Sequence, residues 1–407
     1  MTKSNNKFSL KINLLNVNYA ISVFVMIVIC FPINNQAYPA LAGILRMAGF
    51  PCAFWAAIIL IREKVYQKKW LIPMWCFFAI MLLCTALMNT SVFQGSLNAV
   101  LKMFTVTVLT DYMMSKDKYL TLRWIACIWG VLMILEALSM VFHVFPGRVS
   151  ENNIPLNNYL FGIRVEINQY LIYVIAFLGF AYFVNQIGRI LPILAIVGGV
   201  YFVIMEKVST SITGLLTFVA VYIATKVVKS ARAWRILIIL MIAFIIVFVI
   251  DRNTLIFESF FVGFLNKDLT LSGRTILWEQ ALSQMKGIHW LFGYGYTPPK
   301  ALHLNVAVFN HPHNQYLQML YNFGIPGFIT YMVILFNQIK QIRLIKKNKQ
   351  IKSVYIASLI ATLAICISSR NFFYLTAQIY YVIAYYLPEL DEYKPRLRVR
   401  WKVRSKA

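Results

Sequence analysis

Residues that could carry chemistry gather in one stretch of the chain, residues 251–327, where the otherwise apolar sequence turns polar. Four of the five histidines lie in this stretch, two of them in His311-Pro312-His313. Arg274 lies in it as well, directly after two small residues. Histidine accepts a proton near neutral pH, and the guanidinium of arginine holds two phosphate oxygens at once. This combination indicates proton transfer beside a phosphate-bearing substrate.

His313 is the strongest candidate for a general base. Pro312 cannot sit inside a helix but suits its first turn, so we place His313 in the N-terminal turn of a helix that begins near Gln315. A helix N-terminus disfavours a protonated imidazole and attracts anions, so the ring is expected to be neutral at pH 7 and close to bound phosphate. The simpler alternative is that His313 only caps this helix. We interpret His311 as structural, and His303 alone as a weak candidate.

A short helix is expected earlier in the same stretch, from about Arg274 to Met285, lying at the membrane surface. Ser272 would cap its start and Gly287 would end it. We interpret Trp278 within this helix as an interfacial anchor, because tryptophan concentrates where lipid meets water. For Arg274 two interpretations stay open. It contacts lipid headgroups, or it grips a phosphate as a bidentate fork.

The elements that position these residues must be membrane helices. Hydrophobic residues make up 60% of the 407 residues, 13% are charged, and the mean hydropathy is +0.68. A soluble globular protein carries about a quarter charged residues. Apolar runs of roughly 17 to 25 residues recur, long enough as helices to cross a hydrocarbon core of about 30 Å. Because lipid offers the backbone no hydrogen bonds, the expected fold is an all-α polytopic transmembrane helical bundle.

Twelve spans are expected, in a single integral membrane domain over residues 1–407. With both termini in the cytoplasm, 28 of the 39 lysines and arginines fall on the cytoplasmic side and nine in the outer segments. Lysine and arginine concentrate in short cytoplasmic connections, so this orientation is favoured, and the net charge of +25 needs no nucleic acid as a partner. The expected spans are 19–36, 40–61, 70–88, 97–114, 122–145, 169–187, 190–206, 212–228, 234–250, 315–337, 353–369 and 371–388.

This orientation puts residues 251–314, between spans nine and ten, outside the cytoplasm as a catalytic loop, because connections of such length are usually functional. The basic tail 389–407 would lie in the cytoplasm against lipid headgroups. The cytoplasmic segments contain neither a Gly-rich phosphate loop nor a Cys/His metal spacing. A cytoplasmic nucleotide-driven reaction is therefore not expected.

Arg46, Lys102 and Glu136 are ionisable residues that fall in the outer halves of the expected spans. Arg46 lies about six residues, or roughly 9 Å, below the outer end of the second span, and Lys102 lies at a similar depth in the fourth. Glu136 lies in the outer half of the fifth. Charges at this depth are costly and often functional, although long cationic side chains also snorkel to the interface. The shared depth predicts one outward-facing polar pocket, with Arg46 and Lys102 as substrate-binding candidates.

The polar stretch combines Ser-Gly-Arg274, Trp278, Gly-Tyr-Gly295 and His313-Asn314, followed after nine residues by Gly324-Ile-Pro-Gly327. Together these motifs, over about 70 residues, resemble the signature region of the O-antigen ligase and polymerase superfamily. The resemblance depends mainly on the spacing of the histidine before the Gly-x-x-Gly break, and the upstream elements are weaker. Phe161-Gly162 and Asn168 are similar to a second feature of the superfamily.

One stretch departs from the family pattern. Members often carry an arginine in the segment that opens span eight, whereas this chain reads Ser209-Thr-Ser-Ile-Thr-Gly214. Lys207, just before it, is the cation that could take the place of that arginine.

The members of this superfamily are integral membrane glycosyltransferases that act on undecaprenyl-diphosphate-linked glycans. The resemblance implies a metal-independent, inverting transfer without a cofactor, at the outer face of the bacterial cytoplasmic membrane. It implies that His313 is catalytic and assists the attacking sugar hydroxyl, while Arg274 and Arg164 hold the diphosphate. The other substrate-binding candidates are Asn314, Arg46, Lys102, Lys207 and His303.

The favoured function is polymerisation of lipid-linked repeat units of a surface polysaccharide, such as O antigen or capsule. This choice depends on the Lys-, Ile- and Asn-rich composition, and a ligase that moves the glycan to the lipid A core shares every motif. A transporter or lipid-linked-sugar flippase is the alternative from another class, but the sequence lacks the repeated halves typical of transporters. Expected partners are the lipid-linked glycans, membrane lipids, a flippase and chain-length regulator proteins.

Overall fold

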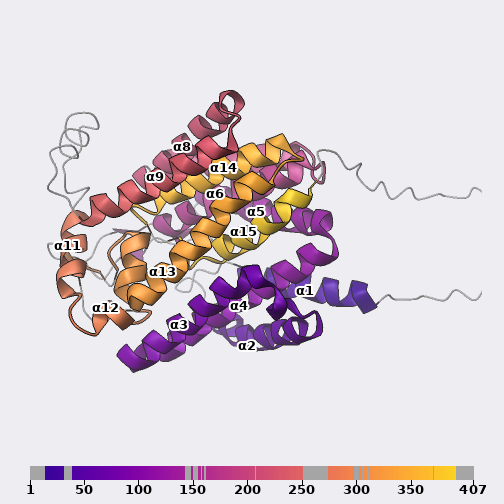
Figure 1. The fold of residues 1–407 in the computed structure, drawn as a ribbon. Helices are drawn as coiled ribbons and strands as arrows, with labels where there is room; N and C mark the ends of the chain where they lie inside the picture. The colour runs from indigo at the N-terminus through magenta and orange to yellow at the C-terminus, as the bar shows by residue number, and fades with distance from the viewer. Residues whose placement is uncertain are drawn as a thin grey trace, which may run out of the picture.

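The computed structural model describes residues 14–31, 39–142, 148–149, 155–156, 158–159, 162–206, 208–250, 274–297, 302–304, 307–309, 311–369 and 371–390. Within these ranges the chain is a bundle of α-helices with three two-stranded antiparallel ribbons in its connections (Figure 1). Lys207, Ser272, the segment 251–273 and most of the predicted basic tail lie outside the described residues.

The long helices match the predicted spans one to one, with shifted ends. One shift concerns α6, which begins at Arg164, so that Asn168 lies inside a helix and not in the preceding connection. The helices are α1 (Leu14–Cys30), α2 (Pro39–Arg62), α3 (Ile72–Met88), α4 (Phe93–Lys116), α5 (Lys118–Val141), α6 (Arg164–Phe183), α7 (Ile190–Glu206), α8 (Ser209–Val227), α9 (Ala231–Ile250), α11 (Arg274–Gln284), α12 (His289–Phe292), α13 (Gln315–Leu344), α14 (Lys349–Ile365) and α15 (Leu375–Tyr386).

Six of these helices are long and apolar enough to cross a membrane by length and composition. A polytopic helical bundle fits this finding, whereas the number of twelve spans stays a prediction. The last two expected spans illustrate the difference, because α14 has 17 residues and α15 only 12. A helix of twelve residues is about 18 Å long, well short of a hydrocarbon core of about 30 Å.

Short ribbons and 3-10 turns complete the described chain. Strands β5 and β6 pair with His303 opposite Val308. The strands are β1 (Arg148–Val149) with β2 (Pro155–Leu156), β3 (Asn158–Tyr159) with β4 (Gly162–Ile163), and β5 (Leu302–Leu304) with β6 (Ala307–Phe309), and the 3-10 turns are η1 (Val65–Gln67), η2 (Lys69–Leu71), η3 (Thr90–Val92) and η5 (Leu387–Glu389).

Local side chains explain where several helices begin. Asp117 caps α5 by accepting hydrogen bonds from the N–H groups of Tyr119 and Leu120, at 3.1 and 3.0 Å. Asn314 and Asn348 cap α13 and α14 in the same way. Asp and Asn are among the best N-caps, because their oxygens satisfy N–H groups that have no partner within the helix.

The helices alternate in direction, so their connections fall at two ends of the bundle. The connections 63–71, 117, 184–189, 228–230 and 345–348 form one end, here called the basic end. Trp70 stacks on Tyr385 there, with ring centroids 3.9 Å apart, and Asn348 Nδ2 donates to the Phe183 carbonyl at 3.4 Å. The other end, here called the histidine end, holds α11, α12 and residues 302–314, on the left in Figure 1.

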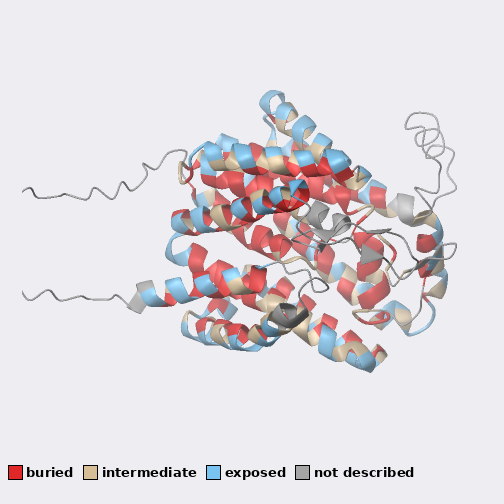
Figure 2. Cartoon of the chain, turned by 180° about the vertical axis from the view of Figure 1, so that it is seen from behind, coloured by how far each residue is buried: buried red, intermediate tan, exposed pale blue. Residues whose placement is uncertain are grey.

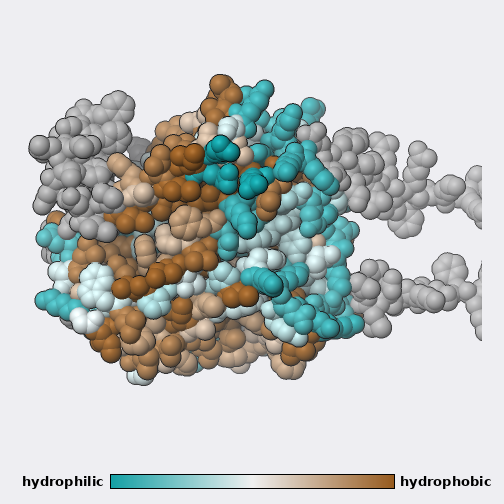
Figure 3. Space-filling view, in the orientation of Figure 1, coloured by the Kyte–Doolittle hydropathy of each residue, from teal (hydrophilic) through white to brown (hydrophobic). Residues whose placement is uncertain are grey.

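Burial and hydropathy follow the pattern of a membrane bundle. Figure 2 shows buried residues lining the inside of the bundle and exposed ones along its outer faces, and Figure 3 shows apolar side chains over the middle with hydrophilic ones gathered toward the basic end. Many of the exposed side chains are large and apolar, such as Phe54, Leu216 and Leu240. Lipid is the environment in which such surfaces are favourable.

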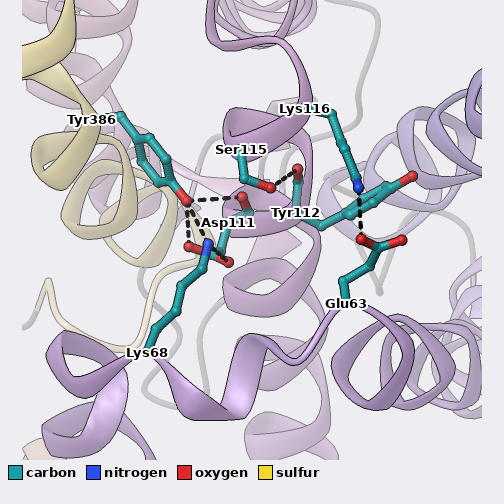
Figure 4. Close-up of polar contacts among 7 residues, drawn as sticks. All are labelled: Glu63, Lys68, Asp111, Tyr112, Ser115, Lys116 and Tyr386. Atoms are coloured by element: carbon teal, nitrogen blue, oxygen red, sulfur yellow. Dashed lines mark hydrogen bonds and ion pairs between the residues drawn. The ribbon is translucent and has the colours of Figure 1, made fainter.

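A buried charged group ties three elements together at the basic end. Asp111 on α4 is fully buried, and its Oδ2 accepts from Lys68 Nζ at 2.7 Å. The hydroxyl of Tyr386, at the end of α15, donates to Asp111 Oδ1 at 2.6 Å and accepts from Lys68 Nζ at 2.8 Å. In Figure 4 these side chains point at one another, beside a more exposed pair, Glu63 and Lys116. A buried carboxylate needs such partners because its desolvation is costly.

We therefore expect Asp111→Asn to lower the free energy of unfolding by about 3 kcal/mol, because one member of a buried pair is lost and the lysine stays. Glu63→Gln is the matched control, and removing that exposed pair should cost at most about 1 kcal/mol. Unfolding of both purified variants in detergent measures the difference. Equal destabilisation by the two changes would contradict the role assigned to Asp111.

Candidate active site

The histidine end is organised around a break in α13. Gly324 has non-helical angles (φ 64°, ψ −165°), and Pro326 has no N–H to donate to the carbonyl of Asn322 one turn earlier. Two N–H groups from another loop take the vacant positions. Tyr294 N donates to Tyr321 O at 2.9 Å, and Gly295 N donates to Asn322 O at 2.8 Å. The predicted break is confirmed, and it serves as a docking site for the Gly-Tyr-Gly loop.

Glycine is required on both sides of this contact. A Cβ on Gly293 would meet the backbone of Asn322 and Phe323, and a Cβ on Gly324 would meet the backbone of Leu291. Both residues also have positive φ, of 63° and 64°, a conformation that glycine adopts without strain. The two glycine motifs thus hold α12 against α13.

Further bonds fasten the same loop to α3. Tyr296 N donates to Thr85 Oγ1 at 3.0 Å, and Asn89 Nδ2 donates to the Thr297 carbonyl at 2.5 Å. The Tyr294 hydroxyl donates to the Gln284 carbonyl at the end of α11 at 2.7 Å. The position of α11 is therefore set by α3 and α13 through this loop.

Trp278 on α11 connects this framework to the histidines. Its side chain is 0% exposed, and its indole Nε1 donates to the Pro312 carbonyl at 2.8 Å. The prediction that Trp278 is an interfacial anchor is therefore wrong. Its indole N–H bonds to the Pro312 carbonyl, between the two histidines. A ring that faced lipid would have no such partner.

The start of α13 differs from the prediction as well. The helix begins at Gln315 with Asn314 as its N-cap, so His313 lies before the cap and not in the first turn. Asn314 is fully buried, with Oδ1 accepting from Leu317 N at 2.9 Å and Nδ2 donating to Ile367 O at 3.0 Å. Both polar atoms of this side chain are engaged within the protein. The structure gives Asn314 a capping role, and its predicted role in substrate binding stays a prediction.

Two N–H groups at this helix start are occupied within the protein. Gln315 N donates to the Cys366 carbonyl at 2.9 Å, and Leu317 N donates to Asn314 Oδ1 at 2.9 Å. These two donors are not available to an anion, and the predicted attraction of phosphate by this helix N-terminus stays a prediction.

His313 itself has a constrained backbone and a half-buried ring. Its φ is +52°, which is uncommon for a residue with a Cβ, although His and Asn are enriched there. The ring lies edge-on to His311 with centroids 4.1 Å apart, and edge-on to Phe309 at 5.0 Å. Half-burial leaves part of the imidazole accessible. A strained, packed and partly open histidine is a suitable acceptor of a substrate proton.

Arg274 lies one helical turn before Trp278 on α11. Residues four apart share a helix face, so Arg274 extends the face that contacts the His313 segment. The side chain is half-buried, and this burial lowers the pKa of its guanidinium, which stays protonated because arginine starts far above neutral pH. A partly desolvated cation on the helix face that carries Trp278 is suited to an anionic leaving group.

His303 and His289 occupy different positions from His313. The backbone of His303 in β5 exchanges two hydrogen bonds with the Gln280 side chain, at 2.7 and 2.9 Å, and its ring is exposed. His289 stacks on Tyr294, and its Nδ1 lies 2.8 Å from the Gly293 carbonyl. His289 is thus part of the docked loop, while His303 remains accessible.

The remaining predicted residues are described less fully. Arg164 is the first residue of α6, at the histidine end, and Arg46 lies in the first half of α2, but their side chains lie outside the described part of the chain, as does all of Lys207. Lys102 is half-buried on α4, which packs against α1 and α2. The shared outer pocket of Arg46 and Lys102 therefore stays a prediction.

Sequence reasoning missed a polar row on α13. Gln315, Gln318 and Asn322 lie three and four residues apart on one face and are almost fully buried. Gln315 Oε1 accepts from the N–H groups of Asn371 and Phe372, at 2.7 and 2.9 Å, and so holds the α14–α15 connection. Three amides at helical spacing in an expected span are the signal that could have identified them, since polar groups in membrane helices are costly.

Fold and site together define a helical membrane protein with a histidine-bearing loop docked on a broken helix. Residues 193–332 match the family model described as O-antigen ligase. The match runs from α7 into α13, covers about a third of the chain, and includes Arg274, Trp278 and His313. It confirms the resemblance to the O-antigen ligase and polymerase superfamily, whose members are glycosyltransferase-like enzymes. No curated protein matches the chain significantly.

The indole of Trp278 gives a specific prediction. Trp278→Phe keeps an aromatic ring but removes the donor to Pro312 and leaves a small space, so stability should fall by about 2 to 3 kcal/mol. Without this bond the Pro312–His313 segment should shift. Because displacement of a catalytic group by about 1 Å can cost roughly 100-fold in rate, activity should fall by about that factor. Glycan made per amount of membrane protein measures the effect. Trp290→Phe on α12, where the side chain is 41% exposed, is the control, and equal activity of both variants would contradict this role.

Proposed function

We propose that the chain polymerises lipid-linked oligosaccharide repeat units of a surface polysaccharide, such as O antigen or capsule. The observation that carries the proposal is the immobilised His313, set between Trp278 and the capped start of α13 inside the matched family segment. The family description names a ligase, so transfer of the glycan to the lipid A core is the second candidate. The two differ in the acceptor and share the chemistry at the donor.

The proposed reaction is an inverting glycosyl transfer. A hydroxyl oxygen of the acceptor sugar attacks the anomeric carbon of the donor and forms the new glycosidic bond. The bond between this carbon and the diphosphate oxygen breaks, and undecaprenyl diphosphate leaves with the electron pair. His313 accepts the hydroxyl proton as the oxygen attacks, which is the general-base role that a positioned imidazole supports.

The leaving diphosphate gains negative charge as the bond breaks. Fixed positive groups placed where this charge develops lower the barrier, and arginine can hold two phosphate oxygens at once. Arg274, on the helix face that also carries Trp278, is the first such group in the proposal. Arg164, at the start of α6, is the second. The other proposed contacts to the lipid-linked glycans come from Arg46, Lys102, Lys207 and His303.

We further propose that the histidine end faces away from the cytoplasm, in the bacterial inner membrane. The concentration of lysine and arginine in the connections of the basic end supports this orientation, because such residues are enriched in cytoplasmic connections. The loop 251–314 then meets lipid-linked substrate at the outer face. A flippase and chain-length regulator proteins are the proposed partners there.

Cysteine labelling tests the orientation. Lys286, after α11, and Lys347, between α13 and α14, are both exposed and lie at opposite ends of the bundle. A cysteine at Lys286 should react with a membrane-impermeant maleimide in intact cells or spheroplasts, and a cysteine at Lys347 should react only after lysis. The wild type gives the background from the six native cysteines. Labelling of Lys347→Cys alone in intact cells would reverse the orientation.

The two arginines are tested by a change that keeps their charge. Arg274→Lys and Arg164→Lys retain a cation but lose the paired hydrogen bonds, so polymer synthesis should fall at least about tenfold in each. Polymer yield at matched protein levels is the measurement, with Lys286→Arg as the control. Wild-type polymer length and yield from both lysine variants would remove the arginines from the diphosphate site.

His313→Asn separates a base from a structural residue. Asparagine adopts positive φ more readily than other residues with a Cβ, so the variant should fold and accumulate normally. Without a proton acceptor the rate should fall about 10²- to 10⁴-fold. Lipid-linked substrate should still be retained, because the arginines remain. Near-normal polymer from this variant would move the assignment to His303 or His311.

A further inference from the structure

A lysine-rich pocket lies at the basic end, far from the histidines. It has a volume of about 440 Å³ and lies between the end of α8, the start of α9 and the start of α14. Among the described residues, its lining contains five lysines and no aspartate or glutamate. A pocket of this size and charge is suited to a phosphate-bearing group. The five are Lys226, Lys229, Lys346, Lys349 and Lys352.

Hydrogen bonds fix the walls of this pocket. Trp234, on α9, is buried and donates from Nε1 to the Val228 carbonyl at 2.8 Å, which sets the turn between α8 and α9. Lys226 Nζ donates to Gln350 Oε1 at 2.6 Å and lies 4.3 Å from the centre of the Tyr222 ring. These contacts join α8 to α14. The pocket is therefore preformed, and a ligand would not need to order it.

The charge balance within this pocket is uneven. Among the described residues, the lining carries five positively charged side chains and no negatively charged one. Gathering like charges raises the energy of the free pocket, and a bound anion would relieve it.

The surroundings favour a lipid over a soluble anion. Exposed apolar side chains continue from the rim along both helices, with Ile223 at 61% and Val227 at 81% exposure on α8, and Ile236 and Leu240 on α9. Acyl chains could cover this surface while the headgroup enters the pocket. Basic pockets between membrane helices bind phospholipid headgroups in this way.

We propose that this pocket binds the phosphate headgroup of an anionic glycerophospholipid, such as phosphatidylglycerol. The site is independent of the proposed glycosyl transfer. It would anchor the ends of α8, α9 and α14 in one leaflet. Soluble phosphate shares the same recognition chemistry, so the test must separate the two sources.

The test is binding of fluorescent phosphatidylglycerol to the purified chain in detergent, followed by anisotropy. The pocket variant carries Lys229→Gln, Lys346→Gln and Lys349→Gln, three exposed lysines of the lining, and keeps Lys226, which joins α8 to α14. Each lysine near a lipid phosphate contributes about fivefold, so affinity should fall roughly 100-fold. The control variant removes three exposed cations of the same end outside the pocket, Lys69→Gln, Arg189→Gln and Lys340→Gln, and should bind as the wild type does.

A third variant with arginine at the three pocket positions should retain binding, which shows that charge is the cause. Unlabelled phosphatidylglycerol should displace the probe, whereas phosphatidylcholine and millimolar inorganic phosphate should not. Equal loss of affinity in the pocket and control variants would overturn the proposal. Full displacement by inorganic phosphate, with no preference for phosphatidylglycerol over phosphatidylcholine, would overturn it in favour of a soluble anion.

Discussion

Two carbonyl groups in α13 have lost their ordinary helical donors, and the histidine end depends on how they are satisfied. Pro326 removes one donor, and Gly324 interrupts the same turn. In a membrane protein an unsatisfied backbone group costs several kcal/mol, so the break must be filled by protein. The Gly293-Tyr294-Gly295 loop fills it with two N–H groups. Because these carbonyls must have donors, the loop is held firmly against α13. Through the loop, the positions of α12 and α11 are set, and with them the position of Trp278.

The same network of hydrogen bonds reaches the segment that holds the proposed base, His313. Trp278 holds Pro312, and Asn314 and Gln315 attach the start of α13 to the α14–α15 connection. These bonds use two of the N–H groups at the helix start, those of Gln315 and Leu317, and so leave fewer donors there for a diphosphate. In the proposed mechanism, anion binding therefore falls mainly to arginine side chains, and His313 serves as the proton acceptor. Gln315, the first residue of the polar row on α13, also holds the α14–α15 connection through its side chain.

The sequence predicted the fold class and the kinds of residue in the site better than their local geometry. Apolar run length indicated the helices, since each must span a similar thickness, and Gly-Ile-Pro-Gly indicated the break in α13. Trp278 was misjudged because composition cannot tell a lipid-facing ring from a buried one with a backbone partner. His313 was misplaced by two residues because proline suits the first turn, yet Asn314 is the better cap. The docking of the Gly293-Tyr294-Gly295 loop on this break could not be predicted, because a contact between segments far apart in the sequence leaves no local periodicity.

The central claim is that this chain itself joins lipid-linked glycan units, and reconstitution tests it most directly. The purified protein would be supplied with a single undecaprenyl-diphosphate-linked repeat unit and no other acceptor, and the products would be separated by size. We predict a ladder of polymers, release of undecaprenyl diphosphate in proportion to the bonds formed, and inverted configuration at each new linkage. Unchanged substrate in this mixture, with transfer appearing only when a lipid A core acceptor is added, would contradict polymerisation and identify a ligase.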